Sequence, residues 1–164
     1  MKFTMSPSRA YLLGAWKSRR TKEGVGVEGN SALCESFLKL CLDERLCRPD
    51  KVKFEEGKAA AKVYFYNSAL RSWLQEEEKK REFRLRFKNE FAASYFAGVF
   101  DARGGTMEVK GKEYCYFLGD ATDELVLLRL GFRAKREGSK IAVLSDDFYG
   151  WLHPHLRLER SRKF

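Results

Sequence analysis

The stretch YFAGVFDARGG, residues 95–105, is an apolar helical segment that contains a glycine and ends in an aspartate, an arginine and two glycines. A glycine inside a helix costs about 0.5–1 kcal/mol relative to alanine. That cost is recovered where two helix backbones must approach more closely than side chains allow. A second such segment, YLLGAWKSRR, begins at Tyr11. We therefore expect Gly14 and Gly98 to face each other where two helices cross.

Two pairs of segments repeat in the same order along the chain. YLLGAWKSRR aligned with YFAGVFDARG pairs Gly14 with Gly98 and Arg19 with Arg103. KVYFYNSALRSWL aligned with KIAVLSDDFYGWL pairs tryptophan with tryptophan and leucine with leucine. Two matches in one order indicate a duplicated α+β unit. We predict two repeats, related by a pseudo-twofold axis and packed through the glycine-bearing helices.

Hydrophobic periodicity and turn residues predict an α+β fold of αββαββα-like repeats. The repeats would span residues 1–84 and 85–164 and together form one compact domain. Between its glycine-bearing helix and its next helix the first repeat has only TKEGVGVEGN, which is room for one strand and no hairpin. Ser6 with Pro7, and later Thr122, are expected to begin helices. The charged segment EEEKKREFRLRF is expected to be a helix end and a solvated bridge.

The chain is basic, with 32 Lys and Arg against 23 Asp and Glu and a formal net charge of +9. This charge is spread over both halves, which favours a polyanion-binding face, although a basic domain without such a role is an alternative. No apolar run approaches the roughly 20 residues of a membrane span. The N-terminus lacks the apolar stretch of a signal peptide. We therefore expect a cytoplasmic monomer that does not bind membranes.

The residue types that most often bind metals or form disulfides show no suitable spacing. Cys34, Cys41, Cys47 and Cys115 show no CxxC spacing, and for the three in or near one amphipathic segment buried free thiols are favoured over a metal site or a disulfide. His153 and His155 flank Pro154 without a nearby cysteine or acidic partner. We predict no metal ion and no cofactor.

Alternation along the strands separates an apolar face from a basic one. Val63 and Phe65 would point into the core, as would Val52 and Phe54. The open face would carry basic and tyrosine side chains: Lys51, Lys53, Lys62, Tyr64, Tyr66, Lys110, Lys112, Arg133, Lys135 and Lys140. Such side chains suit phosphate positioning and groove contacts. Exposed strand lysines also protect sheet edges against aggregation, which is the alternative reading.

FAGVFDARGG resembles a degenerate LAGLIDADG motif, and LLGAWKSRR resembles a second, more eroded copy. The order of elements is similar to that of LAGLIDADG homing endonucleases and intron maturases over nearly the whole chain. The resemblance implies that the two motif helices pack on each other and that the sheets form a saddle along the DNA major groove. Duplex DNA is then the favoured partner, with RNA as an alternative. In this family the last acidic residue of each motif holds a divalent metal at the scissile phosphates.

The two positions that the resemblance assigns to the metal are Arg19 and Arg103. Mg²⁺ binds through oxygen ligands, which a guanidinium does not supply. Asp101 lies two positions earlier, about 200° round the helix, and Glu23 is the acid nearest to the first motif. We expect Asp101 to be a solvated or capping residue. The arginines would either bind phosphate or suit the negative ends of the helix dipoles.

Three functions follow as alternatives. The favoured one is a non-catalytic nucleic-acid-binding protein derived from a homing endonuclease, with no catalytic residue. The second is an active metal-dependent endonuclease that uses displaced acids such as Glu23, Asp101 or Asp120. The third is an RNA maturase or a scaffold for a protein partner. Whether the chain is an enzyme is left open by these alternatives, with the arginines favouring that it is not.

Overall fold

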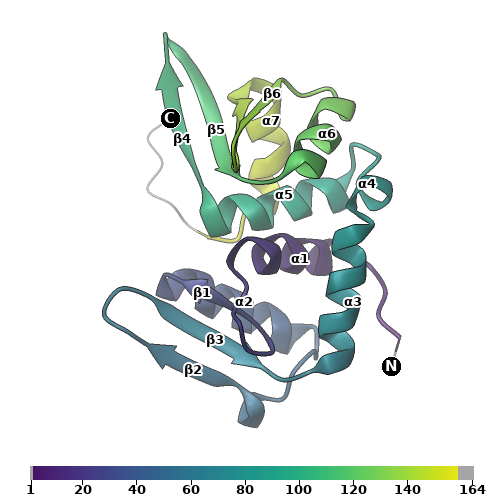
Figure 1. Ribbon diagram of the computed structural model, residues 1–164, viewed down its shortest axis with the longest axis vertical. Helices are drawn as coiled ribbons and strands as arrows, with labels where there is room; N and C mark the ends of the chain where they lie inside the picture. Colours follow the sequence, from purple (N-terminus) through teal and green to yellow (C-terminus); the bar gives the residue numbers. More distant parts are fainter. Residues whose placement is uncertain (1, 159–164) are drawn as a thin grey trace.

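The computed structural model describes residues 2–158 and shows an α+β fold with two antiparallel sheets, one from each half of the chain (Figure 1). The helices of the described residues are α1 (Pro7–Arg19), α2 (Ser31–Asp43), α3 (Ser68–Lys79), α4 (Arg81–Arg84), α5 (Glu90–Arg103), α6 (Ala121–Arg129) and α7 (Ser145–Leu152). Short 3-10 helices lie at Pro49–Lys51 and His153–His155.

The strands of the first half are β1 (Val25–Gly29), β2 (Lys53–Glu56) and β3 (Ala61–Phe65), ordered β1-β3-β2. Those of the second half are β4 (Gly104–Val109), β5 (Lys112–Leu118), β6 (Ala134–Glu137) and β7 (Lys140–Leu144), ordered β4-β5-β7-β6. The prediction of two α+β repeats is thus confirmed, including the single strand that replaces the first hairpin of the first repeat.

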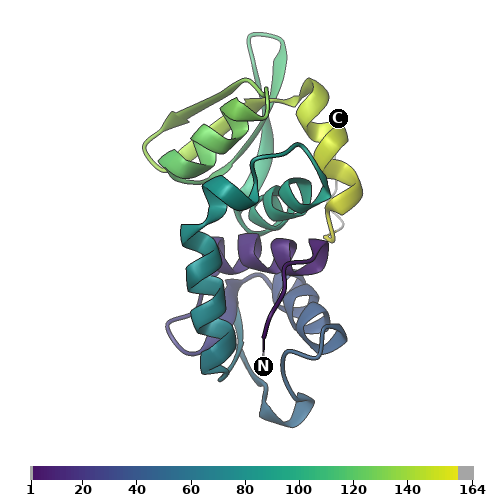
Figure 2. The same cartoon turned by 90° about the vertical axis from the view of Figure 1, so that its right-hand side faces the viewer.

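Helices α1 and α5 lie side by side at the centre of the molecule, between the two sheets (Figures 1 and 2). Gly14 and Gly98 form their crossing. A methyl group on Gly98 would collide with the backbone carbonyl of Tyr11, and one on Gly14 with that of Tyr95. The helices therefore pack backbone to backbone. Figure 2 shows the side of the molecule on which α3 and α4 pass from one half to the other.

Local sequence accounts for most of the helix starts. Ser6 accepts a hydrogen bond from the Arg9 N–H at 3.2 Å, with proline at the first helical position, as expected. The prediction that Thr122 begins α6 is wrong. Asp120 occupies the cap position and forms a capping box with Asp123, because a carboxylate accepts from the free N–H groups and suits the positive helix end.

Two packing predictions also need correction. Val52 packs against the core, but Phe54 is 40% exposed because β2 is a short edge strand whose residues are all exposed. The segment EEEKKREFRLRF is not a solvated bridge throughout. Glu77 and Arg81 are buried within it, and each forms ion pairs across helices or along the segment.

The core is continuous across both halves and centres on the large side chains of the crossing helices. Tyr11, Trp16, Tyr95, Phe96 and Phe100 are each at most 1% exposed. The cysteines are free thiols: Cys34, Cys41 and Cys115 are buried, whereas Cys47 is only partly buried against the core, which corrects the expectation for that residue. Burial raises the pKa of the Cys41 thiol well above its usual value. Within the described residues, none of the helices combines the length and apolar character that crossing a bilayer requires.

Candidate nucleic-acid interface

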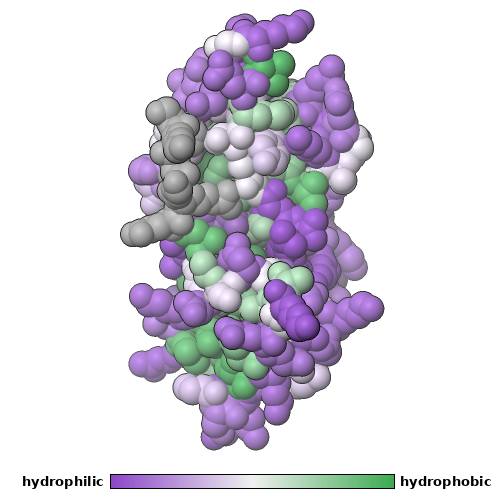
Figure 3. Space-filling view, turned by 90° about the vertical axis from the view of Figure 1, so that its left-hand side faces the viewer, coloured by the Kyte–Doolittle hydropathy of each residue, from purple (hydrophilic) through white to green (hydrophobic). Residues whose placement is uncertain are grey.

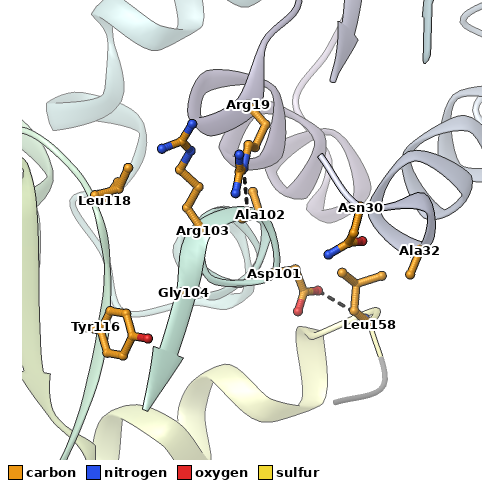
Figure 4. A pocket seen from close by; sticks show the side chains of 10 residues that line it. All are labelled: Arg19, Asn30, Ala32, Asp101, Ala102, Arg103, Gly104, Tyr116, Leu118 and Leu158. Carbon is orange, nitrogen blue, oxygen red and sulfur yellow. Dashed lines mark hydrogen bonds between the residues drawn. The ribbon is translucent and has the colours of Figure 1, made fainter. Parts of the chain in front are cut away.

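The C-terminal ends of α1 and α5 meet at one depression of about 620 Å³ (Figure 4). Arg19 ends α1 and Arg103 ends α5, and both side chains line this depression. The Arg19 Nε–H donates to the carbonyl oxygen of Ala102 at 3.1 Å, which anchors this guanidinium on the end of the other helix. The pseudo-twofold relation of the helices thus places both motif arginines at the depression where α1 and α5 end.

The two arginines interact unfavourably with each other. Burial, and then the positive charge of Arg103, lower the pKa of Arg19, while Glu28 acts weakly in the other direction. Among residues 2–158, neither guanidinium forms an ion pair. This end of the crossing therefore presents two adjacent positive charges, and no carboxylate of residues 2–158 forms an ion pair with either of them.

Asp101 lines the same depression but is not the solvated or capping residue that the sequence predicts. It is only 2% exposed, and its Oδ2 accepts a hydrogen bond from the Tyr11 hydroxyl at 2.6 Å. The same oxygen accepts from the backbone N–H groups of Arg157 and Leu158, at 2.8 and 3.3 Å. The carboxylate thus ties α5 to α1 and to the chain after α7. Burial and this carboxylate raise the pKa of the Tyr11 phenol far above its usual value.

Glu23 and Asp120, the other two acids considered as catalytic residues outside the motif positions, each form their own contacts away from Asp101. Glu23 pairs with Lys62 at 2.7 Å on the first sheet. Asp120 caps α6 and accepts from the Arg81 guanidinium at 2.8 Å. Burial alone would raise the pKa of Asp120, but the hydrogen bond from Arg81 holds it well below its ordinary range.

The residues at the helix ends do not fit the divalent metal that the resemblance implies. Arg19 and Arg103 offer no oxygen ligand, and the Oδ2 atom of Asp101 is taken up by three N–H and O–H donors. Within residues 2–158, no group of three His, Cys, Asp or Glu side chains lies close enough to hold a metal.

A buried ionic cluster beside the crossing escaped the sequence analysis. Asp123 is fully buried and accepts from Arg81 at 2.7 Å, from the Tyr95 hydroxyl at 2.8 Å and from Lys17 at 3.1 Å. Lys17 occupies the position in the first motif that Asp101 occupies in the second. The spacing of Asp120 and Asp123 before an apolar run is the capping-box signal that could have revealed one part of the cluster.

A tyrosine–carboxylate pair lies on each side of the crossing, and one of the two belongs to this cluster. Tyr11 donates to Asp101, which belongs to the partner motif helix. Its counterpart Tyr95 donates to Asp123 of α6, because α1 carries Lys17 where an acid would be needed. The second acid is thus supplied by another helix, and the lysine is neutralised by it.

The open face of the first sheet carries largely compensated charge. Lys62 Nζ lies 2.7 Å from Glu23 Oε2 and 3.8 Å from Glu55 Oε2. The hydrogen bond between Lys62 and Glu23 raises the pKa of the lysine and lowers that of the carboxyl. Tyr64 and Tyr66 form an edge-to-face pair beside them, with ring centroids 5.9 Å apart. The expected contact residues Lys51 and Lys53 are exposed at the border of this half.

The second sheet has basic side chains around an apolar and aromatic middle. Cys115 and Phe117 of β5 are buried, so the residues that alternate with them, Tyr114, Tyr116 and Leu118, face the open side. Lys140 lies with its Nζ 4.4 Å from the centroid of the Tyr116 ring. The five basic residues expected here are all exposed: Lys110, Lys112, Arg133, Lys135 and Lys140. The chain brings them to the same half as Arg103.

The molecule was also compared with known proteins. No family model and no curated protein matches the sequence. Solved structures of the homing endonuclease I-DmoI are similar. A structure of its mesophilic variants has a TM-score of 0.63 at 16% identity, covering 92% of this chain and 96% of that one. A variant in complex with its nicked target DNA in the presence of manganese has a TM-score of 0.66 at 15% identity, covering 92% and 98%. I-DmoI in complex with DNA and calcium has a TM-score of 0.61 at 15% identity, covering 90% and 88%. This likeness shows that the chain has the fold of a LAGLIDADG homing endonuclease.

Proposed function

We propose that this protein binds nucleic acid, with duplex DNA as the favoured partner, and that it binds without cutting the strands. The observation that carries the proposal is the pair Arg19 and Arg103 at the joined helix ends, where cleavage of the kind implied by the resemblance would need metal-binding acids. The net charge of +9 and the exposed basic residues of the second half support binding to a polyanion. The fold likeness to a protein whose solved structures contain target DNA supports duplex DNA.

The arginine pair suggests how a phosphate of the bound strand is held. Two guanidiniums that repel each other across a depression are stabilised when an anion lies between them. A guanidinium grips a phosphate through two charge-assisted hydrogen bonds, which are stronger than neutral ones. In this proposal Arg19 and Arg103 position a backbone phosphate at the centre of the interface. The two arginines thus provide a phosphate-binding site at the position where metal-assisted hydrolysis would need acidic metal ligands.

The proposal is tested by selecting the fragments that the protein binds from random DNA and RNA pools. The binding and the cleavage of the selected fragments are then measured. We expect duplex DNA to be retained and no nicking in Mg²⁺ or Mn²⁺. Affinity should fall steeply with salt, by about 0.9 in log K per log salt for each phosphate neutralised. A flat salt response would favour a protein partner instead.

Cleavage would favour the alternative of an active endonuclease. Metal-dependent nicking that disappears in Asp101→Asn or Glu23→Gln would contradict the proposed function. Thermal unfolding of each variant is needed beside this assay, because Asp101 also joins three parts of the fold.

Removing both motif arginines is expected to weaken DNA binding by about 1–3 kcal/mol, similarly for all sequences, because phosphate contacts carry no base information. The double variant Arg19→Ala with Arg103→Ala should also flatten the salt slope by about two phosphate contacts. The measurement is a salt titration of binding by fluorescence anisotropy. The fold should persist, since neither arginine belongs to the apolar crossing.

A matched control removes the same charge elsewhere. Arg48 and Arg129 are exposed and form ion pairs with the exposed acids Asp50 and Glu82, so their double alanine variant should leave the slope near that of the wild type. If both double variants behave alike, the effect of Arg19 and Arg103 is that of net charge. If the Arg19→Ala, Arg103→Ala double variant binds DNA with wild-type affinity, these arginines only stabilise the C-terminal ends of their helices through the helix dipole.

A further inference from the structure

The open face of the second sheet has an apolar floor. In the register of the sheet, Met107 lies opposite Tyr114, and Tyr116 lies opposite Ala142, with all four side chains on the open side. The Tyr116 ring extends over Gly105 of the neighbouring strand, where a side chain would meet its hydroxyl. This floor differs from the first sheet, whose open face carries the Glu23–Lys62–Glu55 charges.

A groove of about 470 Å³ runs along this floor, from Met107, Val109 and Tyr114 to the chain that follows α6. Two of its residues, Val109 and Leu128, are among the most exposed large apolar side chains of the described residues, at 45% and 50%. Figure 3, which faces the side at which α1 and α5 end, shows hydrophobic residues between hydrophilic ones in the upper half, formed by the second repeat.

Basic side chains border the groove. Arg133 and Lys135 line it directly, and Lys140 borders the adjoining hollow over Ala142. Lys135 Nζ lies 3.8 Å from Glu137 Oε1. Both side chains of this ion pair are 82% exposed, so their attraction is weak and leaves the positive charge of Lys135 accessible to a polyanion. An apolar floor with a cationic border fits a polyanion that presents an apolar strip between two lines of phosphates.

The major groove of duplex DNA presents such a strip only where it contains thymine. The C5-methyl of thymine projects into the major groove beside acceptors at adenine N7 and thymine O4 and a donor at adenine N6, whereas G·C pairs present acceptors at O6 and N7 and a donor at N4 without a methyl group. Covering the polar edges of either pair with methionine, valine and alanine leaves them without hydrogen bonds, and only the thymine methyl group offers an apolar contact that offsets this cost. The floor therefore discriminates against G·C pairs and favours a row of thymine methyl groups.

We propose that the second sheet recognises a thymine-rich half-site, meaning the half of the bound duplex that lies on this sheet, by apolar contact with thymine methyl groups, while the charge-compensated first sheet reads the half-site that lies on it less strictly. This inference rests on the proposed binding of duplex DNA and adds to it the base composition that the protein selects and the groove that selects it.

The test replaces thymine by deoxyuridine, which removes only the methyl group. Duplexes selected from a random pool are resynthesised with deoxyuridine in one half-site at a time, and their affinities are compared at fixed salt. We expect one half-site to be thymine-rich and to lose about two- to fourfold in affinity for each methyl group that the floor buries. The same exchange in the other half-site should leave affinity unchanged.

Two variants at one position assign the effect to this groove. Met107→Gln keeps the length of the side chain but places an amide on the floor, so it should bind thymine and deoxyuridine duplexes equally. Met107→Leu keeps the floor apolar and should retain the preference. Both variants should show the salt slope of the wild type, because neither changes a basic residue.

The possible failures are distinguishable. Duplex binding that ignores deoxyuridine in both half-sites, or a selected half-site rich in G·C pairs, overturns this inference and leaves the proposed function standing. A preference for single strands overturns it as well. Absence of binding to any nucleic acid removes the proposed function and this inference together.

Discussion

Replacing Gly98 by alanine is expected to lower the free energy of unfolding by about 4 kcal/mol or more, although alanine is the better helix former. The added methyl group would meet the carbonyl oxygen of Tyr11, with the Ala15 nitrogen 2.9 Å away. These are backbone atoms of α1 and cannot turn aside as the end of a side chain can. The two helices would have to separate, and the buried contacts along their whole crossing would loosen. Chemical denaturation of the variant measures the loss.

The chain offers a matched control in Gly150, which also lies in a helix but where an added methyl group would meet no atom within 4 Å apart from its chain neighbours and the backbone of its own helix. Gly150→Ala should stabilise the protein by about 0.5–1 kcal/mol. Gly14→Ala should behave like Gly98→Ala, since its methyl group would meet Tyr95 and Val99. Equal stability of the Gly98 and Gly150 variants would contradict the backbone-to-backbone crossing.

The second large effect is expected at Asp123. Changing this residue to alanine should destabilise the protein by about 3–5 kcal/mol, because it leaves the buried Arg81 and the largely buried Lys17 to share Asp120 as their carboxylate partner among the described residues. The Tyr95 hydroxyl would also lose its acceptor. Thermal and chemical unfolding of the purified variant give the measurement.

An exposed ion pair provides the comparison for Asp123. Glu82 and Arg129 pair across α4 and α6 with more than half of each side chain exposed, so Glu82→Gln should change stability by less than about 1 kcal/mol. Combining Asp123→Ala with Lys17→Met should recover part of the loss, since one uncompensated cation is then removed. If the double variant is no more stable than Asp123→Ala, Lys17 does not depend on this carboxylate.

The sequence by itself determined the architecture of the protein. The repeated glycine within an apolar helical segment predicted the crossing of α1 and α5, and the short TKEGVGVEGN segment predicted the single strand β1. These features are local, because helix periodicity, turn residues and segment length act over a few neighbouring residues. The resemblance of the two motifs then led to the homing endonuclease fold and to Arg19 and Arg103.

Only the tertiary structure decided which charged side chains are compensated and which remain available. Asp101 is joined to Tyr11 across 90 positions of the chain, and Lys17 to Asp123 across 106. Lys62 is neutralised by Glu23, which lies before a different strand, whereas the apolar groove of the second sheet arises from strands and a helix that meet only in the folded chain. Such partners are set by packing between distant elements, and no local pattern reports them, because the free energy of an ion pair or an apolar contact depends on burial that exists only after folding.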